Sequence, residues 1–330
     1  MLITIRHVIL FMFFLVSLIR SASINCSKEK RCKTTRIHGF RTSDCYNMDF
    51  RTFPKCLPSN IDVIELSQNR IRKVGKEELS LYTHLTHLYL SDNLIVNLED
   101  DTFTELSSLE TLDLSTNAIS KVPASIFELS SLKTLYLSNN MNINIAESIE
   151  EAMPIHQSSL TKLDISFITE EDSPTDFPDF TELPLVANLD ITGDQFSVIT
   201  PEHFAKLCNL QILSNHNVTT EFKDVCDCWK INNWLTSRNV QFTPFYCPLK
   251  EQECKGNQIN QDHLQLFEIC KEKVNTFKES KLLGKVGLWL GIVVTASVIC
   301  GIWIGCYIKR RKNNRTTRYK EVLKLDHRTN

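Results

Sequence analysis

The sequence predicts an α/β-type solenoid: a short curved stack of about six or seven repeats with parallel strands on its concave face, disulfide caps and one transmembrane helix. Three observations predict it. An apolar pattern recurs with a period near 24 residues, ten cysteines gather at the two ends of the repeated region, and 23 residues without a charge stand near the C-terminus. A repeat stack counts as one domain, even in a chain of 330 residues.

Residues 1–23 predict a signal peptide. They carry Arg6, an apolar run over residues 8–19, and the small residues Ser21 and Ser23 where a cleavage site needs them. An uncleaved membrane anchor is the alternative, but the apolar run is short for crossing a bilayer. The sequence therefore predicts that the following part of the chain is exported.

Residues 61–217 contain copies of one pattern, of which LETLDLSTNAI is an example. Neither a helical nor a strand period fits a whole copy, because only its LDL segment alternates. Close copies start at Ile61, Leu85, Leu109 and Leu132, and looser ones at Leu160, Val186 and Leu210. The pattern resembles the leucine-rich-repeat family, with its signature L-x-x-L-x-L-x-x-N-x-L at about 20 to 29 residues. The resemblance implies a horseshoe with its parallel strands on the concave face.

Each copy supplies an inward row of leucines and a return segment that fills the same core. Three phenylalanines lie 18 residues after their repeat starts and are expected to be buried: Phe103, Phe127 and Phe204. Four asparagines stand where the chain leaves the strand and are expected to satisfy turn backbone groups: Asn69, Asn93, Asn117 and Asn140. Later copies have Ile168, Asp194 and Val218 there, which predicts a less regular stack toward the C-terminal end.

Residues 24–60 and 218–270 predict cysteine-rich caps that cover the two ends of the stack. The ten cysteines of the exported part, for which disulfides are expected, are Cys26, Cys32, Cys45, Cys56, Cys208, Cys226, Cys228, Cys247, Cys254 and Cys270. The pairing within the N-terminal cap stays open. Zinc binding at Cys226 and Cys228 is an alternative that an oxidising compartment disfavours.

The segment CDCWKINNWL, residues 226–235, resembles the C-terminal cap of extracellular leucine-rich-repeat proteins. The resemblance implies that Cys226 and Cys228 pair with two later cysteines. Cys270 is then one expected partner, and either Cys247 or Cys254 is the other. The remaining one of these two would pair with Cys208.

Residues 286–308 predict a transmembrane helix, because 23 residues without a charge reach roughly 34 Å. Residues 271–285 form a juxtamembrane segment. The tail, residues 309–330, holds nine Lys or Arg against two acids and is expected to stay cytoplasmic. The predicted topology is a single-pass type I protein of the plasma membrane. The helix carries two G-x-x-x-G pairs on one face, which indicate close packing with a second copy or another protein: Gly287, Gly291, Gly301 and Gly305.

The residues between the leucines of the predicted strands point out of the concave face. One position per repeat gives a row of acids and tyrosines: Glu65, Tyr89, Asp113, Tyr136, Asp164 and Asp190. His87 lies beside it. Tyrosine offers a large contact area and carboxylates bind arginine, so the row predicts a site for a basic protein surface. An ordinary solvated face is the alternative.

Two further features stand in the exported part. The acidic segment 169–184 is expected to loop out, where it is either a solvated linker or a second binding element with Phe177 and Phe180. Asn217, in the sequence NVT, is a predicted glycosylation site.

The net charge and a check for catalytic motifs indicate which classes of function remain. The net charge is −2 and the tail is strongly basic, so the exported part is acidic and nucleic acid is excluded as a partner. The sequence contains no H-E-x-x-H, G-x-S-x-G or phosphate-loop motif, which predicts a binding protein, not an enzyme, without cofactor or metal.

Two functions stay open. One is a receptor, co-receptor or adhesion protein whose ectodomain binds an extracellular or cell-surface protein. The other is an accessory subunit of a channel or receptor, engaged through the glycine-faced helix. This second function rests on a resemblance of overall architecture to the leucine-rich-repeat auxiliary subunits of large-conductance potassium channels. A tail of 22 residues is expected to hold no signalling domain of its own.

Overall fold

The computed structural model describes residues 32–326 except 142, 156–157, 171–172 and 255–260, and it describes no side chains for 281–292 and 308–326. The predicted signal peptide and Cys26 therefore lie outside the described residues. The chain divides into two units, residues 1–271 and 272–330.

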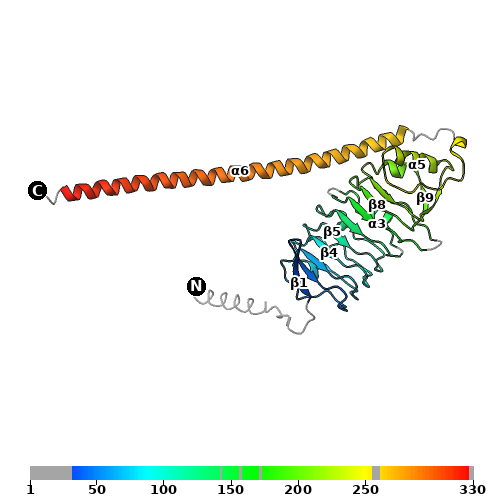
Figure 1. Cartoon of the computed structure of the whole chain (residues 1–330), viewed down its shortest axis with the longest axis horizontal. Coiled ribbons are helices and arrows are strands. Elements are labelled where there is room, and N and C mark those ends of the chain that lie inside the picture. The colour runs from blue at the N-terminus through cyan, green and yellow to red at the C-terminus, as the bar shows by residue number, and fades with distance from the viewer. Residues whose placement is uncertain (1–31, 142, 156–157, 171–172, 255–260, 327–330) are drawn as a thin grey trace, which may run out of the picture. The chain divides into compact units, whose positions relative to one another are not determined.

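The first unit is built on one long sheet (Figure 1). Among the described residues its strands follow the order β1-β2-β3-β4-β5-β6-β7-β8-β10. The repeat strands are β3 (Val63–Glu65), β4 (His87–Tyr89), β5 (Thr111–Asp113), β6 (Thr134–Tyr136), β7 (Lys162–Asp164), β8 (Asn188–Asp190) and β10 (Ile212–Ser214). Each pairs in parallel with the next. One strand comes from each predicted repeat, which confirms the solenoid with parallel strands.

The central residue of each repeat strand is an inward aliphatic side chain. These residues are in register and buried: Ile64, Leu88, Leu112, Leu135, Leu163, Leu189 and Leu213. The return segments carry short helices: α2 (Lys76–Leu79), η1 (Ala124–Ile126), α3 (Ile145–Ala152) and α4 (Pro201–Ala205). Phe103, Phe127 and Phe204 are buried in the same core, as predicted. Apolar burial shared between neighbouring repeats is the main stabilising contribution in such a stack.

The four asparagines tie each repeat to the one before it, and all but the half-buried Asn117 are buried. The amide of Asn93 donates to Leu66 O and Leu90 O, both at 3.0 Å, and its Oδ1 accepts from Ile71 N at 3.0 Å. Asn69, Asn117 and Asn140 repeat the arrangement. The predicted role of the asparagines is therefore confirmed.

The turn just before each asparagine position has left-handed backbone. Seven residues share this place, with φ between +52° and +76°: Gln68, Asp92, Thr116, Asn139, Phe167, Gly193 and Asn217. The conformation is set by the turn, because only one of the seven is glycine, the residue that adopts it at least cost.

The stack becomes less regular after β7, as predicted. A second, two-stranded parallel sheet forms between β9 (Gln195–Ile199) and β11 (Thr219–Phe222). Part of the acidic segment 169–184 joins it through a bridge between Thr175 and Phe196. The expectation that this part of the segment loops out is therefore wrong, and so is the alternative in which Phe177 and Phe180 form a second binding element. They are only 6% and 1% exposed, because Phe177 packs against Phe196 with ring centroids 5.1 Å apart.

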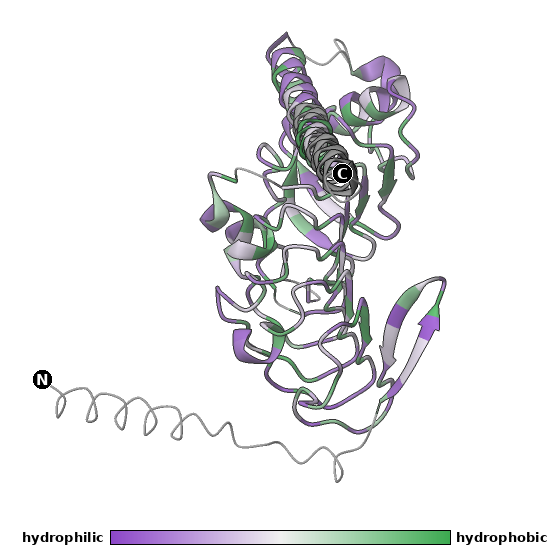
Figure 2. Ribbon diagram, turned by 90° about the vertical axis from the view of Figure 1, so that its left-hand side faces the viewer, coloured by the Kyte–Doolittle hydropathy of each residue, from purple (hydrophilic) through white to green (hydrophobic). Residues whose placement is uncertain are grey.

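A β-hairpin closes the N-terminal end of the sheet. β1 (Lys33–Ile37) is antiparallel to β2 (Phe40–Asp44), and β2 pairs in parallel with β3. Figure 2 shows this hairpin standing away from the repeats. A disulfide between Cys32 and Cys45 fixes its base, and Cys56 is also disulfide-bonded.

The C-terminal cap contains α5 (Asp227–Ser237), η2 (Glu251–Glu253) and the start of α6 (Gln261–Asp326). Cys226 pairs with Cys254 and Cys228 with Cys247. Both cysteines of the CDC segment thus pair with later ones, but the expected pairing of Cys270 with one of them is wrong. Cys270, in α6, pairs with Cys208, which follows α4. The Cα atoms of these two cysteines are 5.9 Å apart, because α6 passes the end of α4.

The second unit is the rest of α6, from Glu272 onward. Among the residues that the structure describes, none of the helices contains an apolar stretch of the length that a membrane span needs. Within the predicted span 286–308, the side chains of residues 286–292, including Gly287 and Gly291, and of residue 308 are not described. Gly301 and Gly305 are described and lie within the helix.

Candidate functional site

The acids and tyrosines predicted to form one row are adjacent on the concave face. The strand register places Glu65 opposite Tyr89, and then continues in single steps through Asp113, Tyr136, Asp164 and Asp190. All six side chains are half-buried. The structure extends the row by one residue, because Asp44 of β2 is the register partner of Glu65. We call these seven residues the concave row.

The carboxylates of the concave row are held in place by the turns that follow their strands. Asp113 Oδ1 accepts from Ser115 N at 2.9 Å, and Asp164 Oδ1 accepts from Ser166 N at 3.1 Å. The same bond forms from Tyr46 N to Asp44, from Ser67 N to Glu65 and from Thr192 N to Asp190. Each acid therefore has a structural role through one oxygen, and its charge is presented in a fixed orientation.

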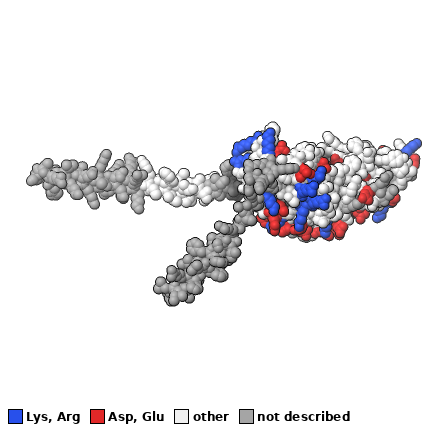
Figure 3. Space-filling model, turned by 90° about the horizontal axis from the view of Figure 1, so that it is seen from below, with Lys and Arg blue, Asp and Glu red and all other residues white. Residues whose placement is uncertain are grey.

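The concave row is not neutralised by the chain itself. None of its carboxylates forms a salt bridge with any residue that the structure describes. Ion pairs lie elsewhere, such as Lys73 with Glu99 and Lys133 with Glu110, both at 2.7 Å. On the face seen in Figure 3, Lys and Arg side chains lie beside Asp and Glu side chains. The concave row differs in that its acids neighbour tyrosines.

The aromatic members of the site interact along the strands. Tyr89 stacks on His87 with ring centroids 6.3 Å apart, and Tyr136 accepts a hydrogen bond from Lys162 Nζ at 3.1 Å. Burial raises the pKa of Tyr89, and the charges of Glu65 and Asp113 raise it further. Burial also lowers the pKa of His87, which keeps its imidazole neutral at physiological pH.

The N-terminal end of the concave row opens into a hollow of about 540 Å³. The hairpin forms one wall and β3 and β4 form the other. We call it the hairpin hollow, and it is lined by Ile37, His38, Phe40, Thr42, Asp44, Tyr46, Val63, Glu65, His87 and Tyr89. Ile37 and Phe40 are exposed at 50% and 42%. Exposed apolar side chains that are rimmed by polar residues are typical of interaction sites.

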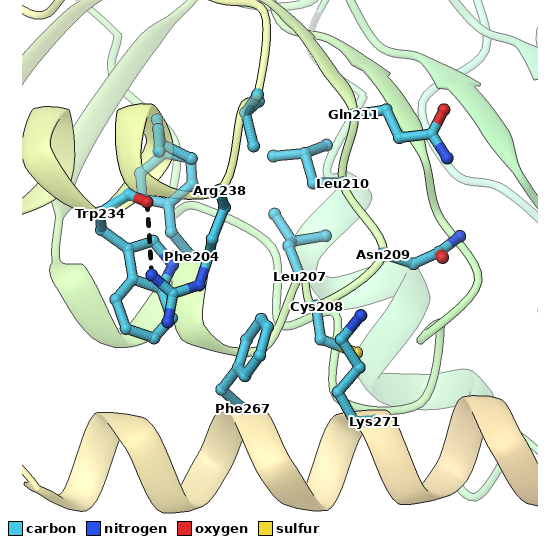
Figure 4. A pocket seen from close by; sticks show the side chains of 12 residues that line it. Phe204, Leu207, Cys208, Asn209, Leu210, Gln211, Trp234, Arg238, Phe267 and Lys271 are labelled. Carbon is cyan, nitrogen blue, oxygen red and sulfur yellow. Dashed lines mark hydrogen bonds between the residues drawn. The ribbon is translucent and has the colours of Figure 1, made fainter.

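A second hollow, of about 230 Å³, lies at the C-terminal cap (Figure 4). Arg238 covers the Trp234 ring, with Cζ 3.1 Å from the ring centroid, and also lies over Phe267. Its Nη1 donates to Trp234 O at 3.5 Å. Leu207 and Leu210 continue the lining into the core of the last repeat. These contacts join the end of the stack to the cap, so we assign this hollow to cap packing.

Sequence reasoning missed the hairpin and its contribution to the site. Asp44, Phe40 and Tyr46 precede the first recognisable repeat and lie in the segment for which the sequence predicts only a cysteine-rich cap. A signal was present: Gly39 follows His38 between two runs of strand-forming residues, and both adopt positive φ in the hairpin turn.

The other predicted site residues lie as follows. Asn217 is exposed in a left-handed turn, where a glycan has room. Gly301 has open space around the position that a Cβ would take, and so has Gly305. The structure brings neither glycine against a partner, so the helix-packing role of the four glycines stays a prediction.

Comparison with known proteins supports the repeat architecture. Residues 83–141 match the family described as "Leucine rich repeat". Podocan-like protein 1 of Mus musculus is 44% identical over 75 residues, which are 22% of this chain and 13% of that protein. Tsukushi-A of Xenopus laevis is 35% identical over 122 residues, which are 35% of each chain.

Two more distant likenesses complete the comparison. The platelet glycoprotein Ib alpha chain of Mus musculus is 29% identical over 93 residues, covering 28% of this chain and 12% of that protein. A solved leucine-rich-repeat protein of Leptospira interrogans aligns at 22% identity with a TM-score of 0.46, over 56% of this chain and 43% of that one. The chain spans about a third or less of the length of these curated relatives. Residues 83–141 are thus a leucine-rich-repeat segment within a longer stack.

Proposed function

We propose that this chain is a cell-surface receptor, co-receptor or adhesion protein that binds a basic segment of an extracellular protein along its concave row. The observation that carries the proposal is the row itself: five oriented carboxylates and two tyrosines on adjacent strands, in which no carboxylate forms a salt bridge with a cation of the described residues. Arginine and lysine on a partner supply the missing charge, and tyrosine adds contact area at low entropic cost.

Four disulfides within the described residues support the extracellular part of the proposal, because such bonds persist in oxidising compartments. The matched relatives include a protein named as a platelet glycoprotein and one named as a human Toll-like receptor. We further propose that residues 286–308 anchor the chain as a single-pass type I protein of the plasma membrane, with residues 309–330 in the cytoplasm. We propose no catalytic activity and no cofactor.

The second candidate function is that of an accessory subunit of a membrane complex. It is favoured by the two G-x-x-x-G pairs, because small residues at this spacing let helix backbones approach closely in lipid. The two functions depend on different residues. The first needs the concave row, and the second needs Gly291 and Gly301.

The deciding experiment is cross-linking of the full-length chain on the surface of cells that express it, with identification of captured proteins. Three variants are compared with wild type: Tyr89→Ala with Asp113→Asn and Tyr136→Ala, Gly291→Leu with Gly301→Leu, and the control Asp100→Asn. Asp113→Asn removes charge but keeps an oxygen for the Ser115 N–H bond. Asp100 is an exposed acid outside the concave row.

If only the triple variant of Tyr89, Asp113 and Tyr136 loses a captured partner, the receptor function is supported. If only the Gly291→Leu, Gly301→Leu variant loses a captured partner, the accessory function is supported and the receptor function is contradicted. Unchanged capture in both variants contradicts both. The control should match wild type, and absence of the chain from the cell surface would contradict the proposed location.

A further inference from the structure

The hairpin hollow contains a pair of like charges on adjacent strands, Asp44 and Glu65. Asp44 and Glu65 are register partners on adjacent parallel strands, so their side chains project to the same side. Like charges at such positions destabilise a sheet. Neither forms a salt bridge within the described residues. A bound cation would turn this unfavourable pair into a favourable one.

Lys33, the register partner of Asp44, lies on the same side of the hairpin as the hollow, but within the described residues it forms no salt bridge with Asp44 and does not line the hollow. The two arginines of the hairpin lie on the other side. Arg36 and Arg41 are register partners of each other. Arg41 alternates with Phe40 and Thr42, which line the hollow, so it projects to the opposite face of the hairpin. His87 in the wall is neutral because burial lowers its pKa. The described lining of the hollow therefore contains two carboxylates and no lysine or arginine.

The orientation of the two carboxylates suits a planar, forked cation. Asp44 Oδ1 accepts from Tyr46 N at 3.2 Å and Glu65 Oε1 accepts from Ser67 N at 2.7 Å, which fixes both groups and leaves each with a second oxygen. A guanidinium presents several N–H donors in one plane and stacks on aromatic rings. Tyr46 and Tyr89 supply such rings in the same lining. An ammonium, as a point charge, would use only part of this arrangement.

The apolar wall indicates what lies next to the cation. Ile37 and Phe40 are register partners at the hairpin tip and remain 50% and 42% exposed. The volume of about 540 Å³ is typical of a site that takes more than one side chain. An apolar residue beside the cation would cover Ile37 and Phe40.

From these features we propose that the hairpin hollow binds an arginine and an adjacent apolar residue of an extended segment in the protein ligand. The proposal rests on the proposed function, since it names the recognition element at one end of the concave row. The hairpin hollow would fix the position of the ligand, and the remaining acids would add attraction along its length.

A peptide selection tests the assignment without knowledge of the ligand. The full-length chain, with its disulfides intact and kept in detergent, is used to select from a phage library of random twelve-residue peptides. We expect enrichment of peptides with an arginine next to an apolar residue. Enrichment of peptides without arginine, or no enrichment, would overturn the proposal.

A synthetic selected peptide is then compared with its citrulline analogue, which keeps the shape of arginine but has no charge. Citrulline should weaken binding to wild type about tenfold or more, because a charge-assisted hydrogen bond is lost. In the double variant Asp44→Asn, Glu65→Gln, which retains both acceptor oxygens for Tyr46 N and Ser67 N, the two peptides should bind nearly equally. An equal effect of citrulline on both proteins would contradict the assignment.

Two more variants separate this proposal from the proposed function. Phe40→Ser should weaken the binding of the arginine peptide and of its citrulline analogue equally, because it removes apolar contact from the hollow. Asp164→Asn with Asp190→Asn alters only the far end of the concave row. If this pair abolishes binding and the hollow variants do not, the concave face binds the ligand and the assignment to the hairpin hollow is wrong. If none of these variants alters binding, both proposals fail.

Discussion

Asp194 occupies the place in its repeat that Asn140 occupies two repeats earlier, but it makes only half of the same contacts. Asn140 Oδ1 accepts from Ile119 N at 3.0 Å, and Asp194 Oδ1 accepts from Ile168 N at 2.8 Å. The amide nitrogen of Asn140 donates to Leu114 O at 3.0 Å and Leu137 O at 2.8 Å, and more weakly to Ser138 O at 3.5 Å. Asp194 Oδ2, in contrast, is fully buried without a hydrogen-bond partner.

A protonated Asp194 would resolve this mismatch, since its O–H can donate where asparagine donates. Burial raises the pKa of Asp194 to about 7, despite the opposing backbone hydrogen bonds from Ile168 and Thr169. Because the folded pKa lies above the ordinary value of 3.8, the stability linked to this proton is complete below about pH 4. It is lost at about 1.4 kcal/mol per pH unit as the pH rises toward 7.

We therefore expect Asp194→Asn to stabilise the chain increasingly from pH 4.5 to 7.5. Thermal unfolding of the two full-length proteins at several pH values gives the difference in Tm, in which the titration of other groups cancels. The difference should grow across this window and level off above it. A difference independent of pH would show that Asp194 stays ionised.

The reverse change, Asn140→Asp, should create the same problem in a regular repeat. The new carboxylate would face Leu114 O and Leu137 O, which now accept from the amide. We expect a loss of about 1–3 kcal/mol at neutral pH and a smaller loss at pH 4.5. Chemical denaturation at both pH values measures it, and an equal loss at both would contradict the expectation.

Phe177→Ala should destabilise the chain by about 3–5 kcal/mol, because a buried ring that packs against Phe180, Phe196 and Phe204 leaves a cavity. Tyr246→Ala is the control, since that ring is 84% exposed, and its effect should stay within about 0.5 kcal/mol. Thermal unfolding measures the loss of stability in the two variants. Similar small effects would mean that the segment 169–184 loops out after all.

Cys208→Ser should release the start of α6 from the last repeat. The disulfide with Cys270 closes a loop with a sequence separation of 62, for which chain entropy gives about 4 kcal/mol. Hydrogen exchange of residues 261–271 should accelerate, while Cys300→Ser, which removes a free exposed thiol, should leave it unchanged. Unchanged exchange in Cys208→Ser would show that packing alone holds the helix.

Asn217 should carry a glycan when the chain passes through the secretory pathway. Its exposed, left-handed turn leaves the side chain accessible to the modifying enzyme. Treatment with an amidase that removes N-linked glycans should lower the mass of the wild-type chain, and the mass of Asn217→Gln should be lower by the same amount before treatment. A wild-type mass equal to that of the variant would contradict export or modification at this residue.

The repeat core was predictable because its signal is repeated. A single L-x-x-L-x-L is ambiguous, but copies in register fix which residues face inward, as Leu88, Leu112 and Leu135 do. Most of the concave row followed from the same register, because residues between inward leucines must face outward. Its anchoring to the next turn, as in Asp113 with Ser115 N, depends on side-chain geometry that no periodicity reports.

The parts outside the repeats were predicted less well, for two physical reasons. The segment around Phe177 has the composition of a loop, but contacts with β9, which come later in the chain, bury it. The pairing of Cys270 depends on the path of α6 past Cys208, and cysteine spacing does not encode that path. The hairpin occurs once, so self-similarity could not reveal it.

The hairpin at the start of the sheet also limits how the chain can change in length. Its outer strand, β1, runs against the direction of every repeat strand and carries Lys33 and Arg36, charges that discourage pairing with another sheet edge. The other edge is closed where Gln241 bridges Ile212. Growth by addition at either end is therefore blocked, so new repeats can enter only by duplication between the caps. Any such duplication would lengthen the concave row and leave the hairpin hollow unchanged.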